Sequence, residues 1–397
     1  MVYVLSHECI AMLFEVPAPD PQEDAVIAQI DEVRRALSYA TASRRWSGVL
    51  ARMTFARDIQ GSNSIEGYNV TIDDAIAASS GEAPLDAVGE TWAALLGYRQ
   101  AMSYVLQLSD DHHFSYSRDL VRSLHYMMVQ HDLTNQPGKW RPGPIFVRNE
   151  QSGERVYEGP DAHLVNGLMR ELIEQLNTPP AGVHPMVLAA LGHLNLVMIH
   201  PFSDGNGRMA RALQTLVLAR SGVLSPQFCS IEEYLGANRQ AYYDVLAAVG
   251  GGRWQPERDT RPWIRFCLTA HFRQATTLMR RARVMHRLWD AVEQRAKQLG
   301  LPDRTVVVLA EAALGLKARN ATYRKNADVS ENLASRDLKQ LVSAGLFVAM
   351  GERRGRYYIA SQELRELGRQ ADAGEPHRVP DPFDVNGYLP GLAPLPQ

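Results

Sequence analysis

The chain has 397 residues, of which 45% are hydrophobic and 22% are charged, values close to those of ordinary globular proteins. Its formal net charge of −2 gives no overall preference for nucleic acids or membranes. The three cysteines include no CxxC pair, which argues against a disulfide framework or a zinc knuckle. Without a signal peptide pattern or an apolar stretch of membrane-spanning length, we expect a cytoplasmic protein of two or three domains.

The first part of the chain is predicted to be helical. Residues up to about 22 are interrupted by prolines and are expected to form an extended arm. From residue 25 to about 60, apolar residues recur at steps of three and four, and similar patterns cover residues 87–106 and 118–130. We assign residues 1–110 to an N-terminal helical region.

A short hairpin is predicted after these helices. Residues 144–148 and 154–157 read as two short strands on either side of a turn that contains Gly153. Because an isolated hairpin is only marginally stable in water, this one must lie on the rest of the protein or on a ligand.

Helices are expected again over residues 161–176, 185–200 and 207–221. The second of these is apolar on nearly all sides, which is typical of a helix buried in the middle of a domain. We assign residues 111–250 to one core domain and the long basic helix over residues 262–299 to a connector, residues 251–300.

The C-terminal part has a different pattern. Residues 305–316, 320–325 and 330–344 are predicted helices, and residues 347–359 contain two strands around a glycine turn. This order resembles a winged helix-turn-helix domain, which we assign to residues 301–365, and the proline-rich residues 366–397 are expected to form an irregular tail. The predicted fold is therefore mainly α, with one small hairpin in the core and a winged-helix-like domain after it.

The segment between the buried helix and the next one contains the residues best suited to chemistry. It reads His200-Pro-Phe-Ser-Asp204-Gly205-Asn206-Gly207-Arg208-Met-Ala-Arg211. Pro201 disfavours α geometry at the residue before it, so the helix should end at His200. Gly205, Asn206 and Gly207 tolerate a left-handed backbone, and the helix that follows offers free amides to an anion.

The charged residues of this segment favour a polyphosphate ligand. Arg208 and Arg211 lie on one helix face, where two cations oppose the helix dipole unless a polyphosphate or a carboxylate compensates them. Asp204 is suited to hold Mg²⁺ between the protein and phosphates. His200 is placed to accept a proton from an attacking hydroxyl group.

This segment resembles the signature of the Fic (filamentation induced by cAMP) family, His-Pro-Phe-x-Asp/Glu-Gly-Asn-Gly-Arg-x-x-Arg, and matches it at every specified position. The resemblance covers roughly residues 60–250 and implies a Fic-type helical core that transfers AMP from ATP to a Ser, Thr or Tyr hydroxyl of a protein. It implies that His200 is the general base and that Asp204 holds Mg²⁺. Gly205, Asn206, Gly207 and Arg208 would hold the α- and β-phosphates, and Arg211 the γ-phosphate. Relatives also suggest self-modification and homodimerisation.

Further segments extend the resemblance. Ser62-Asn-Ser-Ile-Glu66-Gly67 is similar to an inhibitory motif of one class of the family, which implies that Glu66 pairs with Arg211 and blocks productive ATP binding. The hairpin is similar to the family's flap, so Ile145, Phe146 and Val147 would align a target peptide by strand addition, although they also suit plain packing.

The segment around Asn238, Tyr242 and Tyr243 is similar to the part of the family that lies near the nucleotide base.

Four alternatives remain open. The same loop could transfer UMP, phosphocholine or phosphate. Gly205 to Ala210 also fits the G-x-G-x-x-A pattern of dinucleotide-binding oxidoreductases, which requires a preceding strand. A metal hydrolase could use His184, His193 and His200, although no HExxH motif is present and we interpret His193 as a packing residue. A transcription regulator with a nucleotide-sensing core is the non-enzyme alternative.

The C-terminal module allows DNA binding without requiring it. Residues 317–356 contain nine basic and four acidic side chains. Arg336 and Lys339 lie on the helix after Ser330, where a recognition helix would enter a major groove. Winged helices also mediate protein contacts, so the partner stays open.

Overall fold

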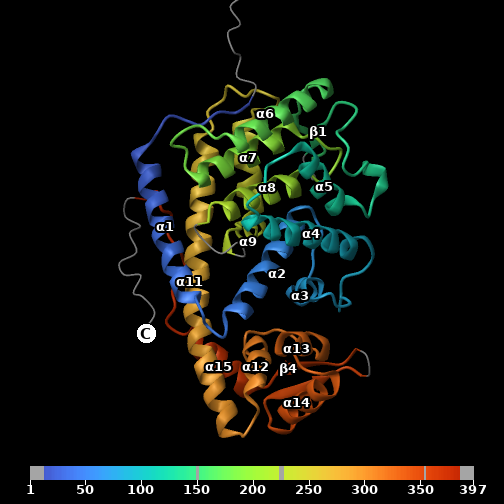
Figure 1. Ribbon diagram of the computed structural model, residues 1–397, viewed down its shortest axis with the longest axis vertical. Coiled ribbons are helices and arrows are strands. Elements are labelled where there is room, and N and C mark those ends of the chain that lie inside the picture. The colour runs from blue at the N-terminus through green and yellow to red at the C-terminus, as the bar shows by residue number, and fades with distance from the viewer. Residues whose placement is uncertain (1–12, 149–151, 223–227, 353–354, 385–397) are drawn as a thin grey trace, which may run out of the picture. The chain divides into compact units, whose positions relative to one another are not determined.

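The computed structural model describes residues 13–148, 152–222, 228–352 and 355–384. The chain divides into two compact units (Figure 1). The first unit comprises the residues up to Ala28 together with Gly97–His271, and the second comprises Gln29–Leu96 together with the residues from Phe272 onward. Three helices continue from one unit into the other, namely α1 (Pro21–Thr41), α4 (Gly89–Gln107) and α11 (Arg261–Gln298).

The first unit is a helical bundle built around one buried helix. It contains α5 (Arg118–Val129), α6 (Val165–Asn177), α7 (Pro185–Ile199), α8 (Asn206–Arg220), α9 (Glu232–Ala237) and α10 (Arg239–Gly250), with 3-10 turns at Leu108–Asp110, Leu133–Asn135 and Ala162–Leu164. Helix α7 packs against α6 and α8. Twelve of its residues are buried, which confirms the prediction of a helix that is enclosed on nearly all sides.

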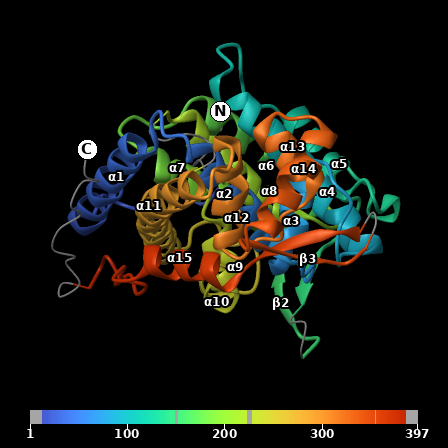
Figure 2. The same ribbon diagram turned by 90° about the horizontal axis from the view of Figure 1, so that it is seen from below.

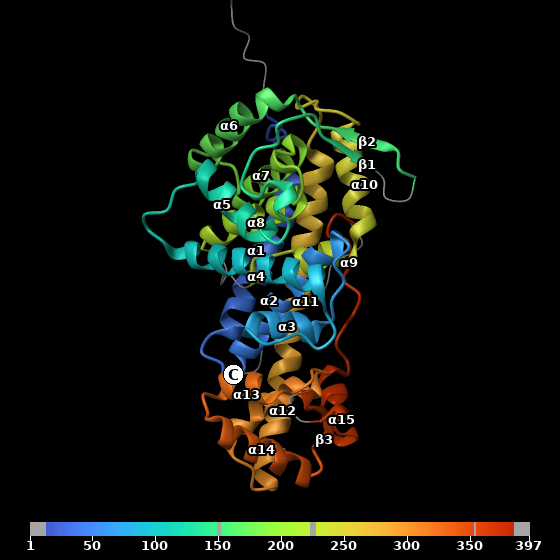
Figure 3. The same ribbon diagram turned by 90° about the vertical axis from the view of Figure 1, so that its right-hand side faces the viewer.

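The predicted hairpin is confirmed and lies on the first unit. Strands β1 (Phe146–Arg148) and β2 (Arg155–Glu158) pair antiparallel, and Figure 2 shows the hairpin extending away from the helices of its unit. The buried Tyr157 hydroxyl donates a hydrogen bond of 2.9 Å to the carbonyl of Met198 in α7. Strand β2 also lies beside α10 (Figure 3), and Glu158 forms a bridge with Arg253. These contacts supply the support that a hairpin of this size requires.

The second unit contains the predicted succession of helices and a second hairpin. Its elements are α2 (Ser47–Ile65), α3 (Ile72–Ser80), a 3-10 turn at Asp303–Thr305, α12 (Val306–Ala313), α13 (Asn320–Ala327), α14 (Glu331–Ser343), β3 (Phe347–Met350), β4 (Tyr357–Ala360) and α15 (Gln362–Asp372). The mainly α fold with two small hairpins is therefore confirmed.

Two features of the second unit correct the sequence prediction. Helix α3 was not expected, and neither was α15, which continues to Asp372 although the irregular tail was predicted to start at residue 366. Gly368 allows α15 to pack closely against α12, because a Cβ atom at this position would lie 2.4 Å from the carbonyl oxygen of Ala313. None of the helices formed by the described residues has both the length and the apolar content needed to cross a bilayer.

Candidate active site

His200 ends the buried helix α7. Its backbone N–H donates to the carbonyl of Leu196 at 3.0 Å, and its φ of 51° and ψ of 59° are left-handed. The predicted end of the helix is confirmed, but the backbone turns into the left-handed region instead of the extended conformation that Pro201 favours. Such a conformation costs about 1–2 kcal/mol for a residue other than glycine, so the surroundings must hold it.

The imidazole of His200 has a defined tautomer. Its Nδ1 atom lies 3.0 Å from the carbonyl oxygen of Val197. Because a carbonyl oxygen can only accept, Nδ1 carries the hydrogen and Nε2 carries the lone pair of the neutral ring. The side chain is half-buried, so it has the protonation pattern and the access that a general base requires.

Arg141 fixes the backbone at the end of α7. It is 4% exposed, and its Nε atom donates to the carbonyl of His200 at 2.8 Å. Its Nη1 and Nη2 atoms donate to the carbonyls of Gly143 and Pro160, at 2.6 and 2.5 Å, at the two ends of the hairpin segment. Burial lowers the pKa of this guanidinium. One cation therefore joins the candidate base to the foot of the hairpin.

The loop after His200 is closed by Asn206. Its side chain accepts a hydrogen bond from the N–H of Phe202 and donates one to the carbonyl of the same residue, both at 2.9 Å. Gly205 caps α8 with a φ of 75°, and a Cβ atom there would lie 2.8 Å from Cγ2 of Val129. Glycine is thus required at this position by conformation and by space.

His125 of α5 contacts the same loop through a hydrogen bond and a ring stack. Its Nδ1 atom accepts from the N–H of Gly138 at 2.9 Å, so Nε2 carries the hydrogen and donates to the carbonyl of Asp204 at 2.8 Å. The ring stacks on Phe202 with centroids 3.6 Å apart and an interplanar angle of 2°. Burial lowers the pKa of His125 to about 4, so the ring is neutral near neutral pH.

The start of α8 has the properties of an anion site. No described residue accepts a hydrogen bond from the backbone N–H groups of Gly205, Asn206 and Gly207. These amides stand at the positive end of a helix of 15 residues. Amides of this kind bind phosphate groups readily, so the loop fits the polyphosphate that its sequence predicts.

Two arginines and one carboxylate complete the charges of the loop. Arg208 and Arg211 are each 1% exposed, and Nη2 of Arg208 lies 3.0 Å from Oδ2 of Asp204. The Asp204 side chain is 43% exposed and can reach a cation as well. The described residues form no cluster of three or more His, Cys, Asp or Glu ligands. A Mg²⁺ held by one carboxylate and the phosphates of a substrate fits this donor set.

Tyr242 and His193 belong to the core of the first unit. Tyr242 is 1% exposed, and its hydroxyl lies 3.0 Å from Nε2 of His193, whose Nδ1 lies 2.6 Å from the side-chain oxygen of Gln214. Burial lowers the pKa of His193 to about 3. With both nitrogens engaged in the core, His193 is unsuited to hold a metal, and the packing interpretation is supported.

The other residues expected near the nucleotide base are more accessible than Tyr242. The side chain of Asn238 donates to the carbonyl of Tyr234 at 2.8 Å, and Tyr243 is 39% exposed. Their contact with a nucleotide stays a prediction.

The inhibitory motif lies in the second unit, at the end of α2. Ser62 is buried in the last turns of the helix, which ends at Ile65. Glu66 is the C-cap, and Gly67 follows with a φ of 85°. The motif thus terminates a helix and leaves its carboxylate at the helix end.

Of the three predicted flap residues, Phe146 and Val147 belong to strand β1 and Ile145 directly precedes it. Ile145, Phe146 and Val147 are all half-buried, and the guanidinium of Arg155 covers the Phe146 ring at 3.5 Å from its centroid. Among the described strands β1 pairs with β2 alone, which leaves its other edge to a further strand. His125 and Arg141 were not predicted as site residues, whereas the loop from His200 to Arg211 was.

Comparison with known proteins agrees with this geometry. Residues 115–218 match the model of the Fic/DOC family. The chain is 28% identical over 261 residues to the protein adenylyltransferase Fic of Nematostella vectensis. The matched region covers 63% of this chain and 55% of that protein. It is 28% identical over 241 residues to the protein of the same name from Aedes aegypti, covering 60% and 44%. The chain spans about half the length of these curated relatives.

Solved structures show the same fold. A Fic family protein from Desulfovibrio desulfuricans G20 has a TM-score of 0.55 at 21% identity, covering 87% of this chain and 98% of that one. A Fic domain containing signaling protein from Bacteroides thetaiotaomicron VPI-5482 has a TM-score of 0.53 at 19% identity, covering 66% and 97%. The helix order found here also rules out the dinucleotide alternative, because α7 and not a strand precedes the glycine loop. The part of this chain that is similar to the Fic/DOC family, residues 115–218, thus contains the loop from His200 to Arg211.

Proposed function

We propose that this chain is a protein adenylyltransferase that uses ATP and Mg²⁺ to transfer AMP to a Ser, Thr or Tyr hydroxyl of a protein. The observation that supports this most strongly is the pairing of a base with an anion site. His200 presents the lone pair of Nε2 at the end of α7, and the loop that follows it ends in the open amides of α8. The curated relatives named protein adenylyltransferase agree with this activity.

In the proposed reaction, Nε2 of His200 accepts the proton of the target hydroxyl while the hydroxyl oxygen bonds to the α-phosphorus of ATP. The bond from this phosphorus to the bridging oxygen breaks, and pyrophosphate leaves. The amides of Gly205 to Gly207 and the guanidinium groups of Arg208 and Arg211 stabilise the negative charge on the phosphates. Mg²⁺, held by Asp204 and the phosphates, would neutralise charge on the leaving group. A positioned base contributes about 10²–10⁴-fold, and the charge stabilisation contributes more.

The test is label transfer from α-labelled ATP in the presence of Mg²⁺. The full chain should label itself, and His200→Ala should lower the rate by about 10²–10⁴-fold through loss of the base. His112→Ala, which changes an exposed histidine in the loop after α4, serves as the control and should keep the rate. Mass spectrometry of the labelled protein separates AMP from UMP, phosphocholine or phosphate. Equal labelling by the His200 variant and the wild type would refute the proposed base.

We further propose that Glu66 restrains this activity by pairing with Arg211, which would then be withheld from the γ-phosphate of ATP. Support comes from the Ser62 to Gly67 motif and from the position of Glu66 at the end of α2. Glu66→Gly should raise self-labelling, whereas Glu257→Gly, a change at an exposed turn, should not. In the double variant with His200→Ala the gain should disappear. If Glu66→Gly labels no faster than the wild type, the brake is absent.

The hairpin is proposed to align the target by adding its strand to the free edge of β1. The carbonyl of Ile145 accepts from the N–H of Gly159, so the N–H and carbonyl of the next residue, Phe146, point away from β2. Phe146→Pro removes the outward N–H, whereas Phe146→Val keeps it. In the Glu66→Gly background, the proline variant should lose labelling of other proteins in an extract while it retains calorimetric ATP binding. Undiminished labelling by the proline variant would exclude strand addition.

A role of the C-terminal module in binding DNA is a second proposal. Arg336 and Lys339 support it, because both are exposed on α14. Other basic residues of the module are engaged within the second unit, since Arg319 pairs with Glu82 at 3.1 Å and Lys317 with Asp73 at 3.8 Å. The proposal therefore depends on α14.

A gel shift with mixed duplex DNA at low salt tests this second role. Salt-sensitive binding that is lost in the double variant Arg336→Glu and Lys339→Glu is expected. This result would also support the transcription regulator in which the Fic core senses nucleotide. The absence of any shift at low salt would remove DNA from the function.

A further inference from the structure

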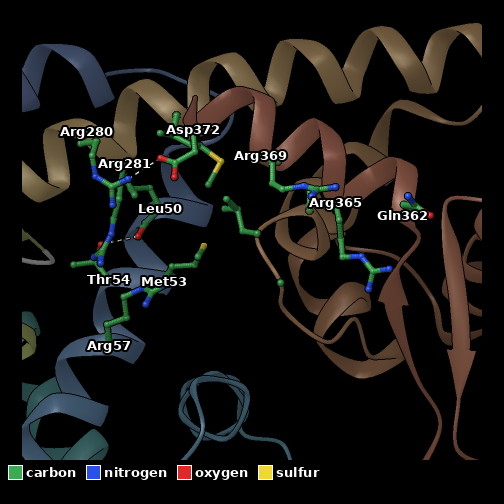
Figure 4. A pocket seen from close by; sticks show the side chains of 16 residues that line it. Leu50, Met53, Thr54, Arg57, Arg280, Arg281, Gln362, Arg365, Arg369 and Asp372 are labelled. Carbon is green, nitrogen blue, oxygen red and sulfur yellow. Dashed lines mark hydrogen bonds and ion pairs between the residues drawn. The ribbon is translucent and has the colours of Figure 1, made fainter. Parts of the chain in front are cut away.

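The second unit contains a cavity that is lined by residues of this unit alone. None of these residues belongs to the loop around His200. The volume of the cavity is about 800 Å³, which is in the range of small-molecule sites. Figure 4 shows its side chains coming from α2, α11 and α15, and the end of α12 supplies Ala313, Leu314 and Gly315.

One part of the wall is aliphatic. Leu50 and Met53 of α2 and Val284 and Met285 of α11 are each at most 7% exposed, and Leu314 is half-buried. The lining residues that the structure describes include no aromatic ring on which a nucleotide base could stack. Methionine and leucine side chains adapt to a flexible hydrocarbon chain, so this wall favours an aliphatic ligand.

The rest of the wall is cationic. Among the described lining residues, five are arginines and Asp372 alone is acidic. The arginines are Arg57, Arg280, Arg281, Arg365 and Arg369. This excess of positive charge at one cavity favours an anion.

The two arginines of α15, Arg365 and Arg369, leave room for a ligand. Arg280 pairs with Asp372 at 2.7 Å. Arg369 pairs with Glu366 at 2.5 Å, but the two side chains are 68% and 46% exposed, and a solvent-exposed pair of this kind is readily exchanged for a ligand. Within the described part of the chain, the guanidinium of Arg365 forms no hydrogen bond or ion pair. Arginine holds carboxylates and phosphates through paired N–H groups, so α15 supplies cations suited to such a headgroup.

We propose that this cavity binds an amphipathic organic anion, an aliphatic chain that ends in a phosphate or a carboxylate. The headgroup lies against Arg365 and Arg369 of α15, and the chain lies against Leu50, Met53 and Met285. This assignment does not depend on AMP transfer, because none of the lining residues belongs to the His200 loop.

Calorimetric titration of the full chain with octyl phosphate, octanoate and inorganic phosphate tests the proposal. Octyl phosphate should bind saturably with one site per chain, and octanoate should bind to the same site. Octanoate binding without octyl phosphate binding would identify a carboxylate site, and the reverse would identify a phosphate site. Inorganic phosphate, which lacks the chain, should bind much more weakly than either. Phosphate binding as tight as that of octyl phosphate would overturn the role of the aliphatic wall.

Variants localise the site. Arg365→Glu should weaken octyl phosphate binding by about tenfold or more, because it replaces a cation at the headgroup by an anion. Arg35→Glu makes the same change at an exposed arginine of α1 that is outside the lining, and it should bind as the wild type does. Leu314→Trp should reduce binding by filling the cavity, and His200→Ala should leave it unchanged. Failure of both amphiphiles to bind saturably, or equal binding by Arg365→Glu and the wild type, would overturn the proposal.

Discussion

Replacing Arg141 by methionine should destabilise the first unit strongly, because one buried cation serves several carbonyl groups. Its guanidinium donates to the carbonyls of His200, Gly143 and Pro160 at distances of 2.8 Å or less. Hydrogen bonds from a charged donor each contribute about 1.5–3 kcal/mol, which gives an upper limit of roughly 5–9 kcal/mol for three. Loss of the guanidinium also removes the desolvation cost of burying it, several kcal/mol. We therefore expect a net loss of about 3–5 kcal/mol.

Scanning calorimetry measures this loss, and Arg122→Met provides a matched control. The control arginine is 44% exposed and donates from Nε to one carbonyl, that of Gly138, at 2.8 Å. Its replacement should cost less than about 1 kcal/mol. The Arg141 variant should unfold about 6–20 °C below the wild type, at 2–4 °C for each kcal/mol. Equal unfolding temperatures for the two variants would refute the view that Arg141 holds the end of α7.

Three further changes probe the loop. The folded pKa of His125 is about 4, below the ordinary 6.5, so the stability that its neutral ring contributes is complete above pH 6.5 and is lost as the pH falls toward 4. In His125→Gln, the free energy of unfolding should therefore fall less steeply with decreasing pH in this range. Part of the fall should remain, because His193 also has a lowered pKa. Gly205→Ala should lower AMP transfer and cost at least about 1 kcal/mol in thermal unfolding, because φ is 75° and Val129 leaves no space. Asn206→Asp should cost about 1–3 kcal/mol, because its carboxylate cannot donate to the carbonyl of Phe202, and unchanged urea unfolding would contradict this.

The loop from His200 to Arg211 was predictable because its signals are local. An apolar helix, a proline and two glycines determine where α7 ends and α8 begins, and the structure agrees within one residue. The left-handed backbone of His200 was not predictable, because the contact that holds it comes from Arg141. Nothing in the sequence around Arg141 indicates a buried cation, since its partners are carbonyl groups that every residue possesses.

Other omissions had readable signals. His125 lies on the apolar stripe of α5 with Val121, Leu124 and Met128, and a histidine on such a stripe must find partners in the core. Helices α3 and α15 both begin after a hydroxyl residue whose side chain accepts a backbone N–H, Thr71 and Ser361 respectively. An N-cap of this kind predicts a helix start.

Helix α2 carries residues of both the cavity wall and the inhibitory motif. Its first three turns carry Leu50, Met53 and Arg57 in the cavity wall, and its C-cap is Glu66. At 1.5 Å per residue, Leu50 and Glu66 are about 24 Å apart along one uninterrupted rod. A ligand that displaced α2 as a rigid body would therefore carry the carboxylate of Glu66 with it, and its effect on self-labelling would report such a displacement.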